Sequence, residues 1–221
     1  MSKQSPTLVS RDEWLSARQK LLIEEKELTK SRDALSNKRR NLPWVKLEQD
    51  YLFETAEGTK NLKELFGDTD QLIVYHFMFG INWEEGCPSC SFWCDHFNYL
   101  PNHLAARNTA FICISNAPIK KLMAYRARMN WEFNWASAQT SQFGTDFGVT
   151  FSDPLNMPSG SYNYTSKPHG QECPGLSVFN RLDDGSIAHS YSTYGRGLDI
   201  LNTAYHLLDM TPSGRNEEDL P

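Results

Sequence analysis

The stretch QLIVYHFMFGINWEEGCPSC, residues 71–90, decides the fold of this chain. It opens with a nearly continuous apolar run, Gln71–Phe79, that is rich in Val, Ile, Tyr and Phe. Such a run is typical of a strand that is buried on both faces of a parallel or mixed sheet. Two cysteines, Cys87 and Cys90, follow the run, and a helical pattern begins at the first of them. The stretch therefore predicts a buried strand that leads into a Cys-Pro-Ser-Cys sequence at the start of a helix.

A cysteine in that position has an unusual chemical environment. The unpaired backbone N–H groups and the positive end of the helix dipole both favour the thiolate of Cys87. Sites of this kind lower the pKa of a thiol from ~8.5 to between ~3.5 and ~7.5, and the thiolate is the nucleophile. The two carboxylates just before it, Glu84 and Glu85, act in the opposite sense. Cys90 lies one helical turn away, so we expect Cys87 to attack a disulfide and Cys90 to resolve the mixed disulfide.

The rest of the chain alternates between strand and helix patterns. We expect strands at 51–53, 71–79, 109–115, 131–137 and 147–151, and a hairpin at 176–182 and 187–194 with an Asp-Gly turn. We expect helices at 10–40, from the cysteine pair to about residue 107, at 118–130 and at 198–210. The segment at 59–66 is predicted to be helical or a turn, and 153–170 to be an irregular loop. This order predicts an α/β fold, with a mixed sheet and helices on both faces.

The N-terminal helix is predicted to form an arm. Ser10 and Glu13 have the spacing of a capping box, and Asn41 and Pro43 end the helical pattern. Its apolar residues repeat at intervals of seven and give one narrow stripe. The stripe either lies on the chain's own domain or packs on another subunit, which would make a homodimer through this helix. We expect an arm at residues 1–43, a domain at 44–210 and a polar tail at 211–221.

Composition excludes several classes of protein. The 221 residues include 12% aromatics, which is too many for a wholly disordered chain. A net charge of −5 gives no general reason to bind nucleic acid or anionic lipid. No apolar run reaches the ~20 residues that span a bilayer, and no apolar segment of a secretory signal follows the first residues. We therefore expect no membrane partner and a cytoplasmic location, where thiols stay reduced and a close cysteine pair is redox-active or metal-binding.

Several motifs together resemble a known family, the bacterial family numbered 899 among domains of unknown function. The motifs that carry the resemblance are GINWEEGCPSCSFWC at 80–94, His-Leu at 103–104, SNAP at 115–118, RMNW at 128–131, FNWAS at 133–137 and YSTYGRGLD at 191–199. The resemblance covers nearly the whole chain, including the helical arm. It implies a thioredoxin-like fold and the activity predicted for the family, that of a dithiol-disulfide oxidoreductase.

The thioredoxin-like architecture also suggests residues for a substrate groove. Pro174 occupies the place of a cis-proline that precedes the terminal hairpin and lies against the first cysteine. We expect Trp83 and Cys173 to border the same groove, although thioredoxin itself has its Trp directly before the first cysteine. Cys173 is either a loop residue or a third redox partner. For the exchange at Cys87 and Cys90 we expect a protein or small-molecule disulfide as substrate and a separate, unknown reductant that recycles the pair, and we expect no cofactor.

The alternative is a non-enzymatic binding module or one that handles copper or zinc. Cys87, Cys90 and Cys94 supply three soft ligands, and Cys90-x-x-x-Cys94 resembles the spacing in copper-binding thioredoxin-like proteins. Structural zinc needs four ligands, and His96 lies on a different side of the helix from Cys94. We therefore expect no metal at this site. Cys94 and Cys113 are predicted to be core residues.

Overall fold

The computed structural model of the chain describes residues 6–217, and it divides the chain into two units, Met1–Pro43 and Trp44–Pro221. The first unit contains the expected long helix, α1 (Arg11–Arg40). The capping box is present, because the Ser10 hydroxyl oxygen accepts from the Glu13 N–H and the Glu13 carboxylate accepts from the Ser10 N–H. What the apolar stripe of α1 contacts stays a prediction. Residues 1–5 of the expected arm lie outside the described residues.

The second unit is built on a mixed sheet. Between residues 6 and 217 the sheet has eight strands, in the order β1-β8-β7-β4-β5-β6-β2-β3. The central strands β4, β5 and β6 are parallel, whereas β7 is antiparallel to β4 and β8 is antiparallel to β7. The strands are β1 (Val45–Lys46), β2 (Leu52–Thr55), β3 (Gly58–Asn61), β4 (Gln71–His76), β5 (Thr109–Ser115), β6 (Asn134–Ser137), β7 (Gly175–Arg181) and β8 (Ile187–Tyr194).

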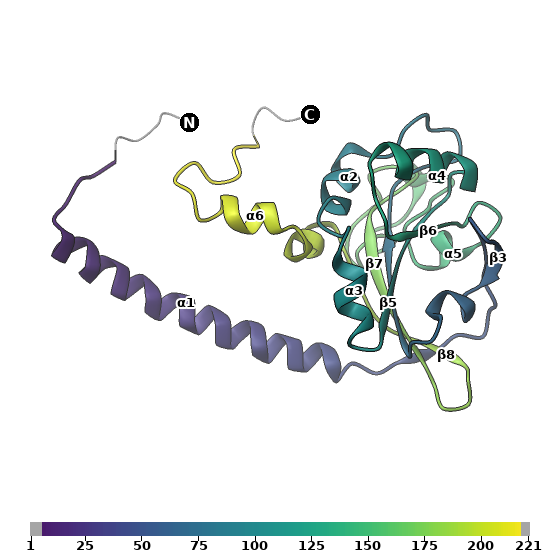
Figure 1. Ribbon diagram of the computed structural model, residues 1–221, viewed down its shortest axis with the longest axis horizontal. Coiled ribbons are helices and arrows are strands. Elements are labelled where there is room, and N and C mark those ends of the chain that lie inside the picture. Colours follow the sequence, from purple (N-terminus) through teal and green to yellow (C-terminus); the bar gives the residue numbers. More distant parts are fainter. Residues whose placement is uncertain (1–5, 218–221) are drawn as a thin grey trace. The chain divides into compact units, whose positions relative to one another are not determined.

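Helices cover this sheet, as Figure 1 shows. The α-helices are α2 (Pro88–Cys94), α3 (Leu100–Ala105), α4 (Ile119–Arg128), α5 (Phe143–Asp146) and α6 (Thr203–Leu208), and the short 3₁₀ helices are η1 (Glu64–Phe66), η2 (Pro154–Asn156) and η3 (Gly195–Leu201). None of the helices described between residues 6 and 217 combines the length and apolar character that crossing a bilayer requires.

The apolar run at residues 71–79 is buried on both faces because its side chains alternate between two cores. Tyr75 packs in a core with residues of α2 and α4, including Cys94 and Leu122. Its neighbour Val74 packs in a second core on the other face, around Phe143 of α5. The continuous apolar pattern, which lacks visible alternation, follows from this double burial.

The order of the elements confirms the expected fold class. A β4–α2–β5 unit with parallel strands is followed by the β7–β8 hairpin and α6. This is the thioredoxin-like α/β arrangement that the resemblance implies. The Asp-Gly turn is also as expected, since Gly185 has a φ of 75°, a conformation that glycine adopts without steric cost.

The predicted helix after the cysteine pair is wrong in its length. It is two helices, α2 and α3, separated by residues 95–99. Pro101 explains the break, because proline has no N–H to donate to the carbonyl of residue 97 and is tolerated only in the first turn of a helix. Pro101 indeed lies in the first turn of α3.

Other boundaries also differ from the sequence-based expectations. The last helix is η3 followed by α6, and the break falls at Asn202, a fully buried residue whose side-chain oxygen accepts from the Tyr205 N–H. The segment at 147–151 is not a strand and contributes one isolated bridge, between Thr150 and Glu172. The strand predicted at 71–79 ends at His76. The short strands β1 and β3 were not expected, because neither has an apolar run.

The core on the face away from the cysteines provides a stability test. Phe143 is fully buried, and its ring centre lies 4.7–5.9 Å from those of five aromatic neighbours, namely Tyr51, Phe53, His76, Phe147 and Phe179. We expect Phe143→Ala to lower the free energy of unfolding by about 3–5 kcal/mol in denaturant titrations, because it leaves a cavity. Leu155→Ala, at an exposed position, should change it by less than about 0.5 kcal/mol. Equal effects of the two variants would contradict this packing.

Candidate functional site

The loop between β4 and α2 holds Cys87 as the residue that caps α2. The Cys87 N–H donates to the Met78 carbonyl oxygen at 3.0 Å, and the Cys87 carbonyl oxygen accepts from the Ser91 N–H at 2.9 Å. Gly86 makes this path possible, because a Cβ at that position would lie 2.7 Å from the ring of the buried Phe77. The strand-to-helix junction predicted from the sequence therefore places Cys87 where the first turn of α2 begins.

Hydrogen bonds to the Cys87 sulfur favour its thiolate. The Cys90 thiol donates to it, and the backbone N–H groups of Cys90 and Ser89 donate as well. These bonds lower the pKa of Cys87 to about 6, although partial burial acts in the opposite sense. Cys87 is half-buried, whereas Cys90 is buried. At neutral pH the ionised form of Cys87 is therefore the main one.

Cys90 has the opposite environment. Its side chain is only 2% exposed, and burial, followed by the neighbouring Cys87, raises its pKa well above that of an ordinary thiol. The N–H of Met78 and the hydroxyl of Tyr75 donate to the Cys90 sulfur and partly offset this effect. The pair thus consists of an accessible thiolate and a buried thiol that keeps its proton.

The two carboxylates before Cys87 do not prevent this arrangement. Glu85 pairs with Arg128 at 2.6 Å, and the guanidinium of Arg128 lies 4.5 Å from the centre of the Tyr125 ring. The ion pair lowers the pKa of Glu85 and supplies a positive charge beside its negative one. The expectation that Glu84 and Glu85 disfavour the thiolate is thus outweighed by the hydrogen bonds to Cys87.

A cavity of about 350 Å³ opens beside the cysteine pair. Ser89 and Cys90 of α2 form part of its wall, and Pro174 forms another part. Every peptide bond between residues 6 and 217 is trans, so the cis bond expected before Pro174 is wrong. Pro174 nevertheless lies at the site with Cys90, and its assignment to a substrate groove stays a prediction.

The other two expected groove residues lie elsewhere. Trp83 lines a larger cavity, about 640 Å³, that also contains Glu172. Cys173 is buried, and its sulfur lies 3.6 Å from Nδ1 of His169. Neither residue lines the cavity beside Cys90. Their involvement in a groove therefore stays a prediction that these positions do not favour.

Residues from the C-terminal end of the chain complete the cavity beside Cys90. They come from η3, from α6 and from the segment expected to be a polar tail: Gly195, Arg196, Leu198, Asp199, Tyr205, Arg215 and Glu217. Sequence patterns predicted a site role for none of them. Arg215 and Glu217 stand in a polar stretch with no apolar pattern, and only the fold brings that stretch to α2. Residues 218–221 of the expected tail lie outside the described residues.

The remaining thiols are placed as core residues. Cys94 and Cys113 are fully buried, with their sulfur atoms 3.8 Å apart. Between residues 6 and 217, no three His, Cys, Asp or Glu side chains come together as a metal site would require.

A family model described as "Bacterial protein of unknown function (DUF899)" matches residues 3–220. The chain belongs to this family. None of the curated proteins compared with it matches. Among solved structures it is similar to the peroxidoxin BcpB from Mycobacterium tuberculosis, with 14% identity over 76% of this chain and 97% of that one and a TM-score of 0.49. It is also similar to a cysteine-to-serine mutant of PrxQ from Xylella fastidiosa, with 13% identity over 76% and 96% and a TM-score of 0.48.

The lowered pKa predicts how this DUF899 protein responds to pH. We expect the rate at which iodoacetamide alkylates Cys87 to rise through pH about 6 and to level off near neutral pH, because the thiolate is the reacting form. Cys90→Ala removes the largest favourable contact and should move the midpoint upward. Mass spectrometry of the Cys87 peptide at each pH measures both midpoints. A wild-type midpoint at the ordinary ~8.5 would contradict the hydrogen bonding described.

Proposed function

We propose that the protein is a thiol-disulfide oxidoreductase that uses Cys87 and Cys90. The observation that carries this proposal is the asymmetry of the pair. Cys87 is accessible, accepts hydrogen bonds from the Cys90 thiol and from two backbone N–H groups, and ionises at about pH 6. Cys90 is buried and stays protonated. A nucleophile and a resolving thiol in contact are the two groups that disulfide exchange requires.

The exchange takes place in two steps. The Cys87 thiolate attacks one sulfur of a substrate disulfide, so that a Cys87–substrate bond forms, the substrate S–S bond breaks and one thiolate leaves. The Cys90 thiol then gives up its proton and attacks the Cys87 sulfur, which releases the second substrate thiolate. The products are a Cys87–Cys90 disulfide and two substrate thiols, which take up the Cys90 proton and one from solvent. The protein loses two electrons and the substrate gains them.

The chain's own residues support each step. The N–H groups at the start of α2 stabilise the negative charge on the Cys87 sulfur before it attacks the substrate. The Tyr75 hydroxyl and the Met78 N–H hydrogen-bond to the Cys90 sulfur, so they stabilise the thiolate that forms there in the second step. A separate dithiol reductant of unknown identity returns the pair to the reduced state. The cytoplasmic location, which would keep such a reductant available, stays a prediction.

The alternative, a module that handles copper or zinc, is less well supported. Cys87 and Cys90 are in contact, but the third sulfur, Cys94, is buried against Cys113 on the inner side of α2. The described residues bring no third ligand to the pair. A two-sulfur site at this position suits exchange with another disulfide better than retention of a metal.

Trapping experiments test this assignment. With dipyridyl disulfide as substrate, we expect the Cys90→Ser variant to keep a pyridylthio group on Cys87, because no thiol resolves it, and wild-type protein to end as an intramolecular disulfide. The Cys87→Ser variant should form neither product at a comparable rate. Intact-protein mass spectrometry distinguishes the three outcomes.

Cys113→Ala is the matched control, since it removes a buried core thiol that lies outside the cavity beside Cys90. It should behave as the wild type does. If Cys87→Ser reacts like the wild type, or if wild-type protein loses no pair of thiols, the oxidoreductase assignment is wrong.

A further inference from the structure

The C-terminal segment, residues 195–217, is attached to the helix that carries the cysteine pair. The indole N–H of Trp93 in α2 donates to the Leu198 carbonyl oxygen at 2.8 Å. Leu198 itself is 2% exposed and belongs to the core that includes Cys90 and Cys94. The short 3₁₀ helix η3, which follows β8, is therefore fixed against α2.

Aromatic packing extends this attachment. The ring of Tyr205 in α6 lies edge-to-face with Trp93, at a centroid distance of 5.2 Å, and with Phe92, at 5.5 Å. Edge-to-face pairs stabilise a contact beyond the area that they bury. Although no residue of α6 is fully buried, Tyr205 thus anchors this helix to the outer side of α2.

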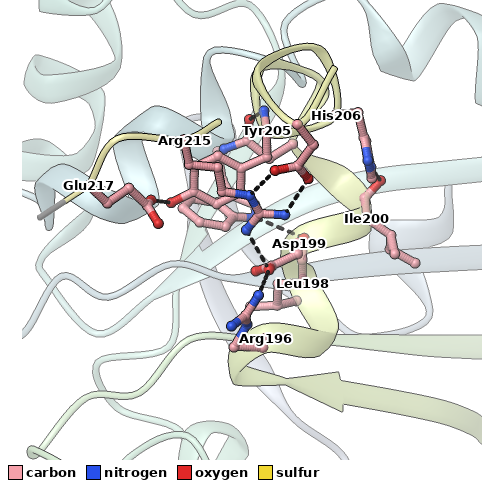
Figure 2. Close-up of polar contacts among 11 residues, drawn as sticks. Arg196, Leu198, Asp199, Ile200, Tyr205, His206, Arg215 and Glu217 are labelled. Carbon is pink, nitrogen blue, oxygen red and sulfur yellow. Dashed lines mark hydrogen bonds and ion pairs between the residues drawn. The ribbon is translucent and has the colours of Figure 1, made fainter. Parts of the chain in front are cut away.

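A cluster of charges holds the end of the segment, as Figure 2 shows. The Arg215 guanidinium makes two hydrogen bonds to Asp209 and one to Asp199, each of 2.9 Å, and its central carbon lies 4.1 Å from the centre of the Tyr205 ring. Arg196 also pairs with Asp199, at 3.2 Å, and the Tyr205 hydroxyl donates to Glu217. Planar, bidentate contacts of arginine are the strong kind. Arg215 therefore keeps the segment folded over Tyr205.

The cavity lies between this segment and α2. Its wall is mostly aromatic and aliphatic, formed by Tyr75, Met78, Trp93, Pro174, Leu198 and Tyr205. Two cationic side chains, Arg196 and Arg215, are balanced by two anionic ones, Asp199 and Glu217. The volume of about 350 Å³ is within the range of about 300–1,000 Å³ for small-molecule sites. Such a wall suits an uncharged, apolar organic group, because it offers apolar contacts and its own charges cancel.

We infer that this cavity binds one half of a small, uncharged organic disulfide, and that the C-terminal segment selects such substrates over the disulfides of folded proteins. The inference rests on the proposed function. Ser89 and Cys90 line the cavity, and Cys87 is the hydrogen-bond partner of Cys90, so we place the organic group that becomes attached to Cys87 in this cavity. A protein disulfide carries chain on both sides of each sulfur. To reach Cys87 from this cavity, that chain would have to pass Gly195, Leu198 and Tyr205, which line the cavity together with Pro174.

The chemistry is that of the two-step exchange. Cys87 bonds to the substrate sulfur whose organic group lies in the cavity, and the other half leaves as a thiolate. Attack by Cys90 then breaks the Cys87–substrate bond and releases the bound half as a second thiolate, which takes a proton from solvent. Tyr205 and Arg215 are specificity-determining residues in this scheme: Tyr205 forms the wall and Arg215 holds it in place.

A binding measurement tests the cavity without redox chemistry. The probe is dipyridyl sulfide, which has one sulfur and no S–S bond. Calorimetry should show saturable binding to wild-type protein and equal binding to Cys87→Ser. Tyr205→Ala should lower the affinity for dipyridyl sulfide about tenfold, because it removes roughly one good aromatic contact. Tyr205→Phe keeps the ring and should retain the affinity, and Met210→Ala, at an 80% exposed position in the same segment, is the matched control.

A rate measurement tests the selection. The ratio of the rate with dipyridyl disulfide to the rate of insulin reduction should be high for wild-type protein and should fall at least about fivefold in Tyr205→Ala and in Arg215→Ala, because both variants open the segment. Circular dichroism and denaturant titration check that the variants fold. Arg215→Lys loses the bidentate contact but keeps the charge, so its rate ratio should lie between that of Arg215→Ala and that of the wild type.

The outcomes separate this inference from the proposed function. If wild-type protein reduces disulfides but dipyridyl sulfide does not bind, or if the rate ratio is unchanged in folded Tyr205→Ala and Arg215→Ala, the inference is wrong and the oxidoreductase assignment stands. If the sulfide binds as described but the trapping experiment fails, the oxidoreductase assignment is wrong, and the selection of disulfides fails with it.

Discussion

The hydrogen bond from the Cys87 N–H to the Met78 carbonyl oxygen, at 3.0 Å, determines where α2 begins. The Cys87 N–H donates to a residue that precedes the helix, whereas the Cys87 carbonyl oxygen accepts the first hydrogen bond within the helix, from Ser91. The next N–H groups along the chain, on Ser89 and Cys90, then have no carbonyl partner in the helix and turn to the Cys87 sulfur. A start of the helix one residue earlier or later would point these donors at another side chain. The acidity of Cys87 is therefore a consequence of backbone register.

The different ionisation of the two cysteines follows from the same register combined with the alternation in β4. Cys90 is one turn further along α2 and faces the sheet, where Tyr75 is one of the side chains that point toward the helix. Burial at that position disfavours the charged form of Cys90, and its proton remains available for the hydrogen bond to Cys87. The pKa of Cys87 is therefore low partly because the pKa of Cys90 is high. Local sequence placed both residues, and the sheet gave them different environments.

The sequence predicted those features that depend on neighbours along the chain, since the apolar run, the Cys-Pro-Ser-Cys spacing and the Asp-Gly turn each specify a local geometry. Errors occur where one residue changes the outcome: Pro101 ends a helical pattern that composition alone would continue, and the buried Asn202 separates η3 from α6.

Residues 211–217 have no periodicity, so sequence patterns could not predict their position. It depends on Arg215, which contacts Asp199 at a separation of sixteen residues and stacks on Tyr205. An isolated surface ion pair contributes at most about 1 kcal/mol, but this guanidinium joins two carboxylates and a ring.

Because α2 is only two turns long, its two sides connect the thiol pair and the C-terminal segment directly. Cys90 and Cys94 face the sheet, whereas Phe92 and Trp93 face Tyr205 on the outside. A rotation of α2 about its axis that moved Cys90 would also break the hydrogen bond from Trp93 to η3 and the contact with Tyr205. The cavity wall and the thiol pair are therefore fixed by the same short helix. In the exchange proposed above, a ligand held by Tyr205 and Trp93 would have a defined position relative to Cys87, which is the geometric condition for efficient exchange.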